Sequence, residues 1–384
     1  MKSSTETNVP ELRFPEFEGE WEKVRFDKLF KITAGGDIKK QHVSETKTEK
    51  YSFPIYANAE KNKGLYGYSD KYKIENDAIT VAGRGANFGI AHARNKKFYP
   101  IVRLLVLIPL KTQNVIFFEY CINKMNFFKE STGVPQLTSP QISSYKIIFP
   151  QLPEQQKIAD FLSQVDRKID LLQQKVAALA QYKKGVMQQL FSQEVRFKRG
   201  LSGVEGQDDG SDFPDWEVKK LGEVLCYNQP TKYIVKSTEY NDSYKTPVLT
   251  AGKTFILGFT NEIENTFTDL PVIIFDDFTL ANHYVDFDFK VKSSAMKILS
   301  ASSKDVNIKF IYESMQMIKF SKGEEHKRFW ISVYSKLKIQ YPCPDEQTKI
   351  ANFLSSIDQK IAHTQEQLEQ TQNFKKGLLQ KMFV

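Results

Sequence analysis

The stretch EQQKIADFL (Glu154–Leu162) returns as EQTKIANFL (Glu346–Leu354), 192 positions further along the chain. The match extends without a gap from residues 149–191 to residues 341–383, with 18 identities in 43 positions. A repeat of this length indicates a duplicated structural unit. The 384 residues therefore consist of two variable segments, each followed by one copy of a common segment.

Both copies of the common segment predict a long helix, because apolar residues alternate at spacings of four and three, as in coiled-coil heptads. Pro153 and Pro344 stand near the start, where a helix tolerates proline. We expect two helices of about 37 residues, about 55 Å each, that pair with one another; the heptads leave open whether they run parallel or antiparallel. The seam consists of Ile158, Leu162, Val165, Ile169, Leu172, Val176 and Leu179 in the first copy and Ile350, Leu354, Ile357, Ile361 and Leu368 in the second, with Thr364 and Thr371 at two further core positions.

The variable segments predict domains built mainly from strands. A short echo opens each half, where Phe14–Phe30 resembles Phe213–Leu225 and Trp21 matches Trp216. After it come β-branched and aromatic runs bounded by Gly, Pro, Asn and Asp, which are typical of strands. The fold class is therefore mixed α/β (α+β), with an internal pseudo-twofold repeat. The expected segments are a first domain at 11–150, a first helix at 151–191, a Gly-rich charged linker at 192–212, a second domain at 213–342 and a second helix at 343–384.

Composition excludes several classes of protein. Hydrophobic residues make up 41% of the chain, enough for globular folding in two or three domains. No apolar run is long enough to span a membrane, and the start of the sequence has no apolar signal core. Three widely separated cysteines fit a reducing cytoplasm. The net charge of +8 is uneven, with +7 over residues 11–150 and −3 over residues 201–342.

Motifs for catalysis are missing from the sequence. There is no phosphate-binding loop and no Asn-Pro-Pro-aromatic loop of adenine methyltransferases, and GRGANFG (Gly83–Gly89) lacks dinucleotide-binding spacing. PDWEVK (Pro214–Lys219) contains the letters of a nuclease motif, but its acidic residues stand too close in sequence to come from two strands. The sequence therefore predicts a protein with no catalytic residue and no metal ligand of its own.

These features together resemble the DNA-specificity (S) subunit of type I restriction–modification systems. The resemblance rests on the duplicated segment, the Phe-Pro…Trp-Glu openings, the run Ser131–Ala159 that joins the first domain to its helix, and the KKG…F helix ends at Lys183–Phe191 and Lys375–Phe383. It covers nearly the whole chain. It implies that each variable domain is a target-recognition domain that reads one half of a bipartite double-stranded DNA sequence.

The resemblance also implies partners. The paired helices would set the spacing between half-sites and dock two methyltransferase (modification) subunits, which methylate adenine at N6, and restriction (motor-nuclease) subunits would join through them. S-adenosylmethionine, ATP and Mg²⁺ would then sit on the partners, and this chain would bind no cofactor and no membrane. A helix of 55 Å limits the separation of half-sites to about 16 base pairs.

Candidate DNA contacts in the first domain follow from side-chain chemistry. Arg pairs with guanine and Asn with adenine, and the glycines around GRGAN permit close approach of the backbone. A solvated turn explains the same letters equally well. The candidates are Arg84 and Asn87 for bases, Gln136 and Thr138 in a stretch that the resemblance places near DNA, and Lys61 and Lys63 for phosphates.

In the second domain Asp277 aligns loosely with Arg84, and a carboxylate accepts a hydrogen bond from cytosine. Because this domain is mildly acidic, it must concentrate its basic residues on one face, for which Lys290–Lys297 and Lys319–Phe329 are the expected segments. The further candidates are Thr250, Lys253, Asn282, His283, Lys327 and Arg328.

Two other interpretations stay open from the sequence. One is a standalone DNA-binding regulator whose coiled coil serves self-association. The other is a metal-dependent nuclease that uses Asp276 and Asp277. A specificity subunit of a system with a fused nuclease–methylase is also compatible with the sequence.

Overall fold

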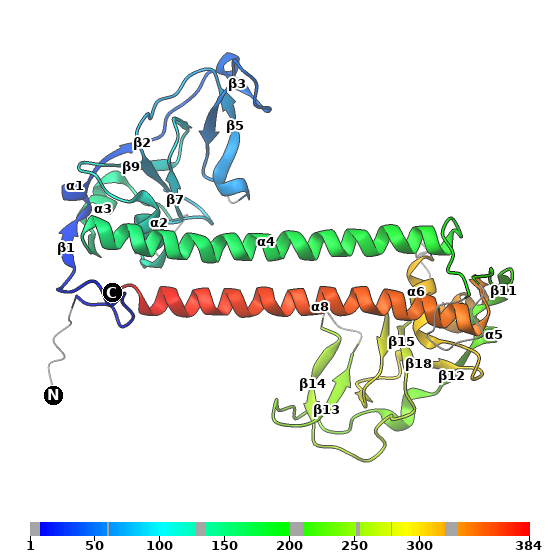
Figure 1. Cartoon of the computed structure of the whole chain (residues 1–384). Coiled ribbons are helices and arrows are strands. Elements are labelled where there is room, and N and C mark those ends of the chain that lie inside the picture. The colour runs from blue at the N-terminus through cyan, green and yellow to red at the C-terminus, as the bar shows by residue number, and fades with distance from the viewer. Residues whose placement is uncertain are drawn as a thin grey trace, which may run out of the picture. The chain divides into compact units, whose positions relative to one another are not determined.

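The computed structural model describes residues 8–59, 61–127, 135–199, 210–250, 254–277, 279–318 and 329–384. The chain forms two compact units (Figure 1). Unit 1 comprises Met1–Gln173 and Glu366–Val384, and unit 2 comprises Gln174–Gln365. Each unit therefore holds one variable domain, the first half of the long helix that follows it, and the second half of the other long helix.

Unit 1 contains three small sheets and five helices or parts of helices in its described residues, the second half of α8 (Pro344–Lys381) among them. The sheets have the strand orders β1-β10, β2-β9-β6-β7 and β3-β5-β4-β8. The elements are β1 (Glu22–Arg25), α1 (Phe26–Leu29), β2 (Phe30–Ala34), β3 (Val43–Ser44), β4 (Phe53–Tyr56), β5 (Leu65–Ser69), β6 (Ala78–Ala82), β7 (Ala91–Arg94), β8 (Tyr99–Pro100), β9 (Leu104–Pro109), α2 (Val115–Lys124), α3 (Ser139–Ser144), β10 (Lys146–Phe149) and α4 (Leu152–Phe191), with 3₁₀ turns at Lys40–His42 and Lys61–Gly64.

Unit 2 has the strand orders β11-β19, β12-β18-β15-β16 and β14-β13-β17, which repeat this topology except that no described strand corresponds to β3. The elements are β11 (Glu217–Lys220), α5 (Leu221–Val224), β12 (Leu225–Asn228), β13 (Thr246–Leu249), β14 (Ile256–Thr260), β15 (Val272–Asp276), β16 (Asn282–Val285), β17 (Lys290–Val291), β18 (Met296–Ala301), α6 (Ile308–Gln316), α7 (Phe329–Ser332), β19 (Lys338–Tyr341) and α8 (Pro344–Lys381), with 3₁₀ turns at Pro230–Tyr233 and Tyr334–Lys336.

The strand predictions are confirmed, and the two domains share their register. In unit 1 Thr80 of β6 lies opposite His92 of β7, and in unit 2 Ile274 of β15 lies opposite His283 of β16. β6 and β15 are buried at every residue, which explains their continuous apolar sequence. This common register allows residues of the two domains to be matched one by one.

The long helices α4 and α8 have 40 and 38 residues, close to the predicted length. In unit 1 the early residue Ile158 of α4 shares a core with the late residue Leu378 of α8, so the two segments are antiparallel. In unit 2 the late residue Leu190 of α4 shares a core with the early residue Ile350 of α8, again antiparallel. All the residues predicted for the seam are buried or half-buried, Thr364 and Thr371 included.

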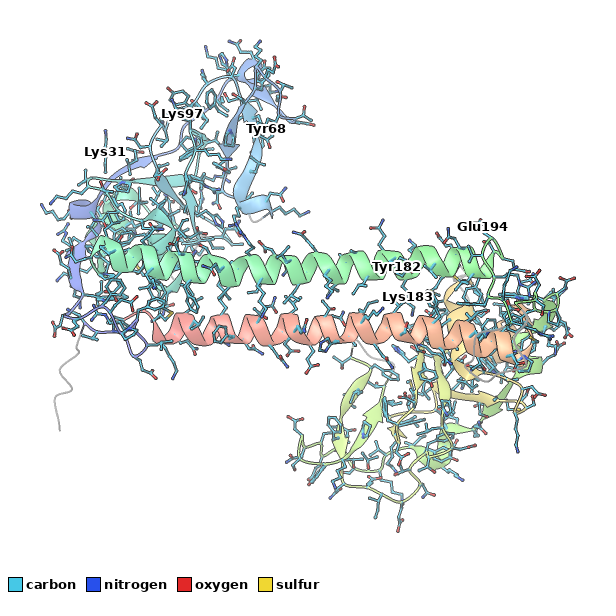
Figure 2. The ribbon with its side chains drawn as sticks, in the orientation of Figure 1. Lys31, Tyr68, Lys97, Tyr182, Lys183 and Glu194 are labelled. Carbon is cyan, nitrogen blue, oxygen red and sulfur yellow. The ribbon has the colours of Figure 1, made fainter. Side chains whose placement is uncertain are left out.

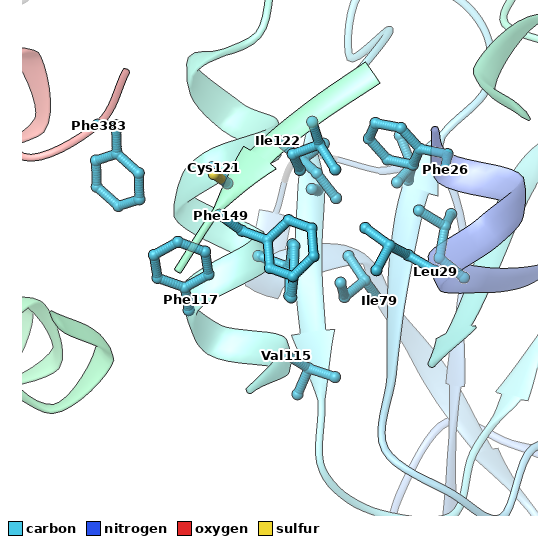
Figure 3. Close-up of a cluster of buried hydrophobic side chains, with 14 of the residues drawn as sticks. Phe26, Leu29, Ile79, Val115, Phe117, Cys121, Ile122, Phe149 and Phe383 are labelled. Atoms are coloured by element: carbon cyan, nitrogen blue, oxygen red, sulfur yellow. The ribbon is translucent and has the colours of Figure 1, made fainter. Parts of the chain in front are cut away.

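The core of unit 1 joins residues that are far apart in sequence. Phe383, just beyond α8, lies opposite Phe117 of α2 in the buried cluster of Figure 3. The Leu12 amide donates to the Lys381 carbonyl at 2.8 Å. The last described residues of the chain are therefore part of the first domain's core.

Candidate nucleic-acid interface

The repeated Glu-Gln pair fixes each variable domain to its helix. Glu154 is 2% exposed and accepts two hydrogen bonds from the Arg13 guanidinium, both 2.8 Å long, and one from the Trp21 indole at 3.3 Å. Burial of a carboxylate is favourable only when donors surround it in this way. Unit 2 repeats all three contacts with Glu346, Arg196 and Trp216.

The neighbouring glutamine joins the helix to the domain's own helix. Gln155 donates to the Pro150 carbonyl at 2.8 Å and accepts from the backbone amide of Asn114, the N-cap of α2, at 3.0 Å. In unit 2 Gln347 makes the same bonds to Pro342 and to Asn307, the N-cap of α6. The identity of the repeated motif is thus explained by one set of contacts made twice.

Each unit also has an aromatic triad, in which a phenylalanine from the end of one repeat helix enters the other repeat's domain. In unit 1 the ring of Phe383 lies 5.5 Å from Phe117 and 6.4 Å from Trp21. In unit 2 Phe191 lies 5.6 Å from Phe310 and 6.5 Å from Trp216.

Ion pairs follow the triads along the helices. In unit 1 Asp166 of α4 accepts from Lys375 at 2.5 Å and from the Tyr120 hydroxyl at 2.6 Å. In unit 2 Asp358 of α8 accepts from Lys183 of α4 at 2.7 Å and from Lys309 at 2.9 Å (Figure 2). Burial acts to raise the pKa of Asp358, but these two ammonium groups outweigh it and lower that pKa.

In the first domain, several predicted base-reading residues come together. Arg84 forms an antiparallel bridge with Gln136, the Leu137 amide donates to the Gly83 carbonyl at 2.8 Å, and the Gly85 amide donates to Pro135 at 3.1 Å. We call residues 83–87 with 135–137 the recognition loop. The side chains of Arg84 and Gln136 are exposed. Two donor-rich side chains therefore stand next to one another on the surface.

Of the other candidates of the first domain, Thr138 has a structural role, whereas Lys61 and Lys63 are exposed. Thr138 is the N-cap of α3 and forms a capping box with Gln141, so its hydroxyl is engaged. Lys61 and Lys63 are exposed on the turn between β4 and β5. That turn is held by Arg94, which is 5% exposed and donates to the Lys63 carbonyl at 2.6 Å. The two lysine ammonium groups are thus presented on a fixed backbone.

The loose alignment of Asp277 with Arg84 is wrong by one position. The Asp277 amide bonds Ala295 as the Gly83 amide bonds Arg103, so Asp277 takes the place of Gly83. Its carboxylate is buried, accepts from the Trp330 amide at 2.9 Å and lies 3.3 Å from the Lys297 ammonium. These contacts favour a structural role.

His283 and Thr250 lie at the β13–β14 hairpin, through contacts with Phe255. The His283 imidazole stacks on Phe255 at 3.9 Å between ring centroids, and burial lowers its pKa against the opposing charge of Asp276. The Asn282 side-chain oxygen accepts from Gln316, and the Thr250 amide donates to the Phe255 carbonyl at 2.9 Å. Lys253, Lys327 and Arg328 lie outside the described residues, as does most of Lys319–Phe329.

The expected basic face at Lys290–Lys297 is not present. Lys290 is 2% exposed and donates to the Glu264 carbonyl at 2.6 Å. Lys292 bonds the Tyr240 hydroxyl at 3.1 Å, and Lys297 pairs with Asp277. The sequence alone could not predict that these lysines are buried or paired, because their partners lie far away in the chain.

No group of three or more His, Cys, Asp or Glu side chains able to hold a metal ion occurs in the part of the chain that the structure describes. Asp276, the other carboxylate of the nuclease interpretation, accepts from the Thr279 amide at 3.2 Å. Among the described residues no helix is long and apolar enough to cross a membrane.

Comparison with known proteins places both halves in one family. The family described as the type I restriction modification DNA specificity domain matches residues 18–181 and, a second time, residues 214–373. The chain belongs to this family. Both family matches include a variable domain and most of a long helix, so the repeat seen in sequence is a repeat of the specificity domain.

Among named relatives, the specificity subunit of the Escherichia coli type I restriction enzyme EcoR124I/EcoR124II is 52% identical over 142 residues. That match covers 36% of this chain and 35% of the relative, so the chain spans about a third of that relative's length. The specificity subunit of the Methanocaldococcus jannaschii type I restriction enzyme MjaVIII is 25% identical over 405 residues, covering 96% of this chain and 92% of the relative.

A solved structure shares the fold of this specificity-domain protein. The S subunit of a type I restriction–modification system from M. genitalium superimposes with a TM-score of 0.70 at 17% identity, covering 98% of this chain and 99% of the other. At that identity the likeness shows the fold. It supports the two-domain, two-helix architecture predicted from the repeat.

Proposed function

We propose that this chain is the DNA sequence-specificity subunit of a type I restriction–modification complex. Each variable domain reads one half of a bipartite double-stranded DNA target. The helices α4 and α8 set the spacing of the half-sites and carry two adenine-N6 methyltransferase subunits, through which motor-nuclease subunits join. The chain supplies no catalytic step, and S-adenosylmethionine, ATP and Mg²⁺ belong to the partners.

The observation that carries this proposal is the duplicated set of contacts. The same carboxylate, glutamine and aromatic triad fix each variable domain to the helices, while the sequences of the two variable domains diverge. A pseudo-twofold molecule offers two equivalent surfaces and so suits two copies of one partner, and its two different loop sets suit two different half-sites.

Exposed residues that repeat on the helices support the docking of two partners. Tyr182 and its counterpart Phe374 are 53% and 55% exposed, and Figure 2 shows Tyr182 on α4. We define the exposed arc as the exposed residues Tyr182, Lys184 and Gln188 with the half-exposed Gly185 on α4, and its counterpart as Phe374, Lys376 and Gln380 with the half-exposed Gly377 on α8. By contrast, the adjoining segments 174–181 and 366–373 share no identical residue. The repetition therefore resumes at Lys183 and Lys375, after a stretch without identity, and it includes exposed residues as well as buried ones.

The glycines of the exposed arc have no explanation within the chain. A side chain at Gly185 or Gly377 would meet nothing within 4 Å. A glycine inside a helix costs about 1 kcal/mol relative to alanine. Glycine permits close approach of another backbone, so a partner helix packed on this face explains both positions.

The test is to co-express the chain with the methyltransferase subunit encoded beside it in a methylation-free host and to map modified adenines across the genome. A split motif with a fixed gap is expected. No methylation, with both subunits shown to be folded, would contradict the proposal and favour a standalone regulator. A continuous motif would contradict reading by two separate domains.

A further inference from the structure

Unit 1 has a cavity of about 170 Å³ next to the recognition loop. Its lining includes Asn58, Asn87 and His92, and the exposed residues Ala59 and Ile90 stand at its rim. We call this cavity the slot. Because Asn87 belongs to the recognition loop, the slot opens beside the surface that the proposed function assigns to DNA.

Unit 2 shows which group fills the corresponding place. The Ala57 amide donates to the Gly64 carbonyl at 2.8 Å, and the Thr250 amide donates to the Phe255 carbonyl at 2.9 Å, so Gly64 takes the position of Phe255. His92 and His283 also match, by their register opposite β6 and β15. Phe255 stacks on His283 with its ring 3.9 Å away and tilted by 21°. In unit 1 glycine supplies no ring, and His92 lines a cavity instead.

One polar atom of the slot, the side-chain oxygen of Asn58, lacks a hydrogen-bond donor among the described residues. Arg94 also lines the slot, and its guanidinium donates to the Thr80 hydroxyl and to the Lys63 carbonyl. The Asn58 side-chain nitrogen donates to the Arg84 carbonyl, so the side-chain oxygen of Asn58 faces away from that carbonyl. That oxygen is buried and has no hydrogen-bond partner among the described residues. Buried acceptors are nearly always satisfied, by protein, water or ligand. The His92 ring is held in place by Glu119, 3.4 Å from its Nδ1 atom.

We propose that the slot receives one unpaired pyrimidine base of the DNA half-site that unit 1 reads. A pyrimidine is a single six-membered ring, like the phenyl ring that occupies the matching place in unit 2. It stacks on His92 and donates a Watson–Crick N–H to Asn58 Oδ1. Thymine is the expected base, because enzymes that modify adenine take it out of the duplex, which leaves its thymine without a pairing partner. This inference rests on the proposed function.

The test uses the assembled methyltransferase complex and the target found by methylation mapping. Duplexes are prepared in which the purine opposite each pyrimidine of each half-site is replaced, one at a time, by an abasic position. Removing the pairing partner removes the cost of unpairing. One position in the half-site read by unit 1 should therefore bind about tenfold more tightly or better.

Two variants close the slot by different routes. Asn58→Leu removes the acceptor, and Ala59→Trp fills the slot from an exposed position without touching the core. Both should abolish the gain in affinity at that position. The matched control, His283→Ala in unit 2, should leave that gain unchanged. Three results would contradict the proposal that the slot binds a base. They are a gain in affinity that persists in Ala59→Trp, no gain in affinity at any position, and equal gains in both half-sites.

The outcome also separates this inference from the function on which it rests. A methylation map without a split motif overturns both. A split motif combined with no position-specific gain overturns the slot alone. Binding of free thymidine to the intact chain, without any gain on DNA, would overturn the assignment to a DNA-borne base.

Discussion

One buried carboxylate fixes each variable domain to its helix. Glu346 allows the stronger test because its side chain is fully buried. Glu346→Ala removes the carboxylate that accepts from the Arg196 guanidinium and the Trp216 indole, and leaves Arg196 only backbone carbonyls as acceptors. Breaking a buried pair costs about 3 kcal/mol or more. Urea unfolding followed by tryptophan fluorescence should show unit 2 destabilised by that amount. Asp345→Ala, an exposed neighbour on the same helix, is the control and should change little.

The Asp358 carboxylate gives unit 2 a pH-dependent contribution. Lys183 and Lys309 lower its pKa in the folded state below the ordinary 3.8, so on acidification the unfolded state takes up the proton first. The stabilisation is therefore complete above about pH 5 and is lost as pH falls through the folded pKa.

Asp358→Asn should lower the midpoint of unfolding at pH 7 and flatten its dependence on pH between about 5 and 3. Thermal unfolding across that range measures both effects, with Asp345→Asn as the control. A variant with the same acid dependence as the natural chain would show that these two lysines do not hold Asp358.

At this scale the sequence predicted some residues and missed others for physical reasons. The seam and the repeated Glu-Gln pair could be predicted, because helical spacing and the 18 identities in 43 positions can be recognised in the sequence itself. The burial of Asp277 and Lys290 was not visible, because their partners lie on other strands and loops. Arg196 was hidden inside a segment predicted as linker, since its acceptor Glu346 lies 150 positions away. The slot could not be predicted from the sequence, because the match of Gly64 with Phe255 is established only by backbone hydrogen bonds.

Among the elements, the long helices combine an internal seam with an external face. The apolar heptads of the seam predict that the two helices pair. They do not predict whether the pair is parallel or antiparallel, because both arrangements bury the same heptad positions. The buried clusters decide for antiparallel. The exposed arc lies outside the seam, so changes there should separate stability from assembly.

Gly185→Ala should stabilise the isolated chain by about 0.5–1 kcal/mol, because alanine is the better helix former and its side chain meets nothing. Gly185→Trp should instead block one partner. Native mass spectrometry of the complex should then show one methyltransferase subunit in place of two, and Gly185→Trp combined with Gly377→Trp should bind none. In the single variant Gly185→Trp, the unsubstituted counterpart of the exposed arc on α8 is the internal control. Unchanged stoichiometry would contradict the docking face.

For the whole molecule, independence of the two domains is the main expectation. Replacing residues 11–150 with the first domain of another family member should change one half of the methylated motif and leave the other half and the gap intact. Methylation mapping measures all three. A swap that altered both halves would rule out separate reading.

The helices themselves should set the gap. Inserting seven residues into both helices, after Gln173 and after Gln365, keeps Asp166 with Lys375 and Lys183 with Asp358. It lengthens each helix by about 10.5 Å, so the gap should grow by about three base pairs. The same insertion in α4 alone should instead destabilise the chain, because one of the two ion pairs must separate.

The division of the chain into units has a consequence for its synthesis. Unit 2 is one continuous stretch, Gln174–Gln365, whereas unit 1 needs Glu366–Val384 to complete a core that begins at Trp21. Domains generally fold as the ribosome delivers them, in order. Here the order is inverted: unit 2 has all its residues once Gln365 has been delivered, whereas unit 1 also needs Glu366–Val384. A product truncated before Phe383 would therefore have a complete second core and an incomplete first core, which exposes apolar surface to proteases.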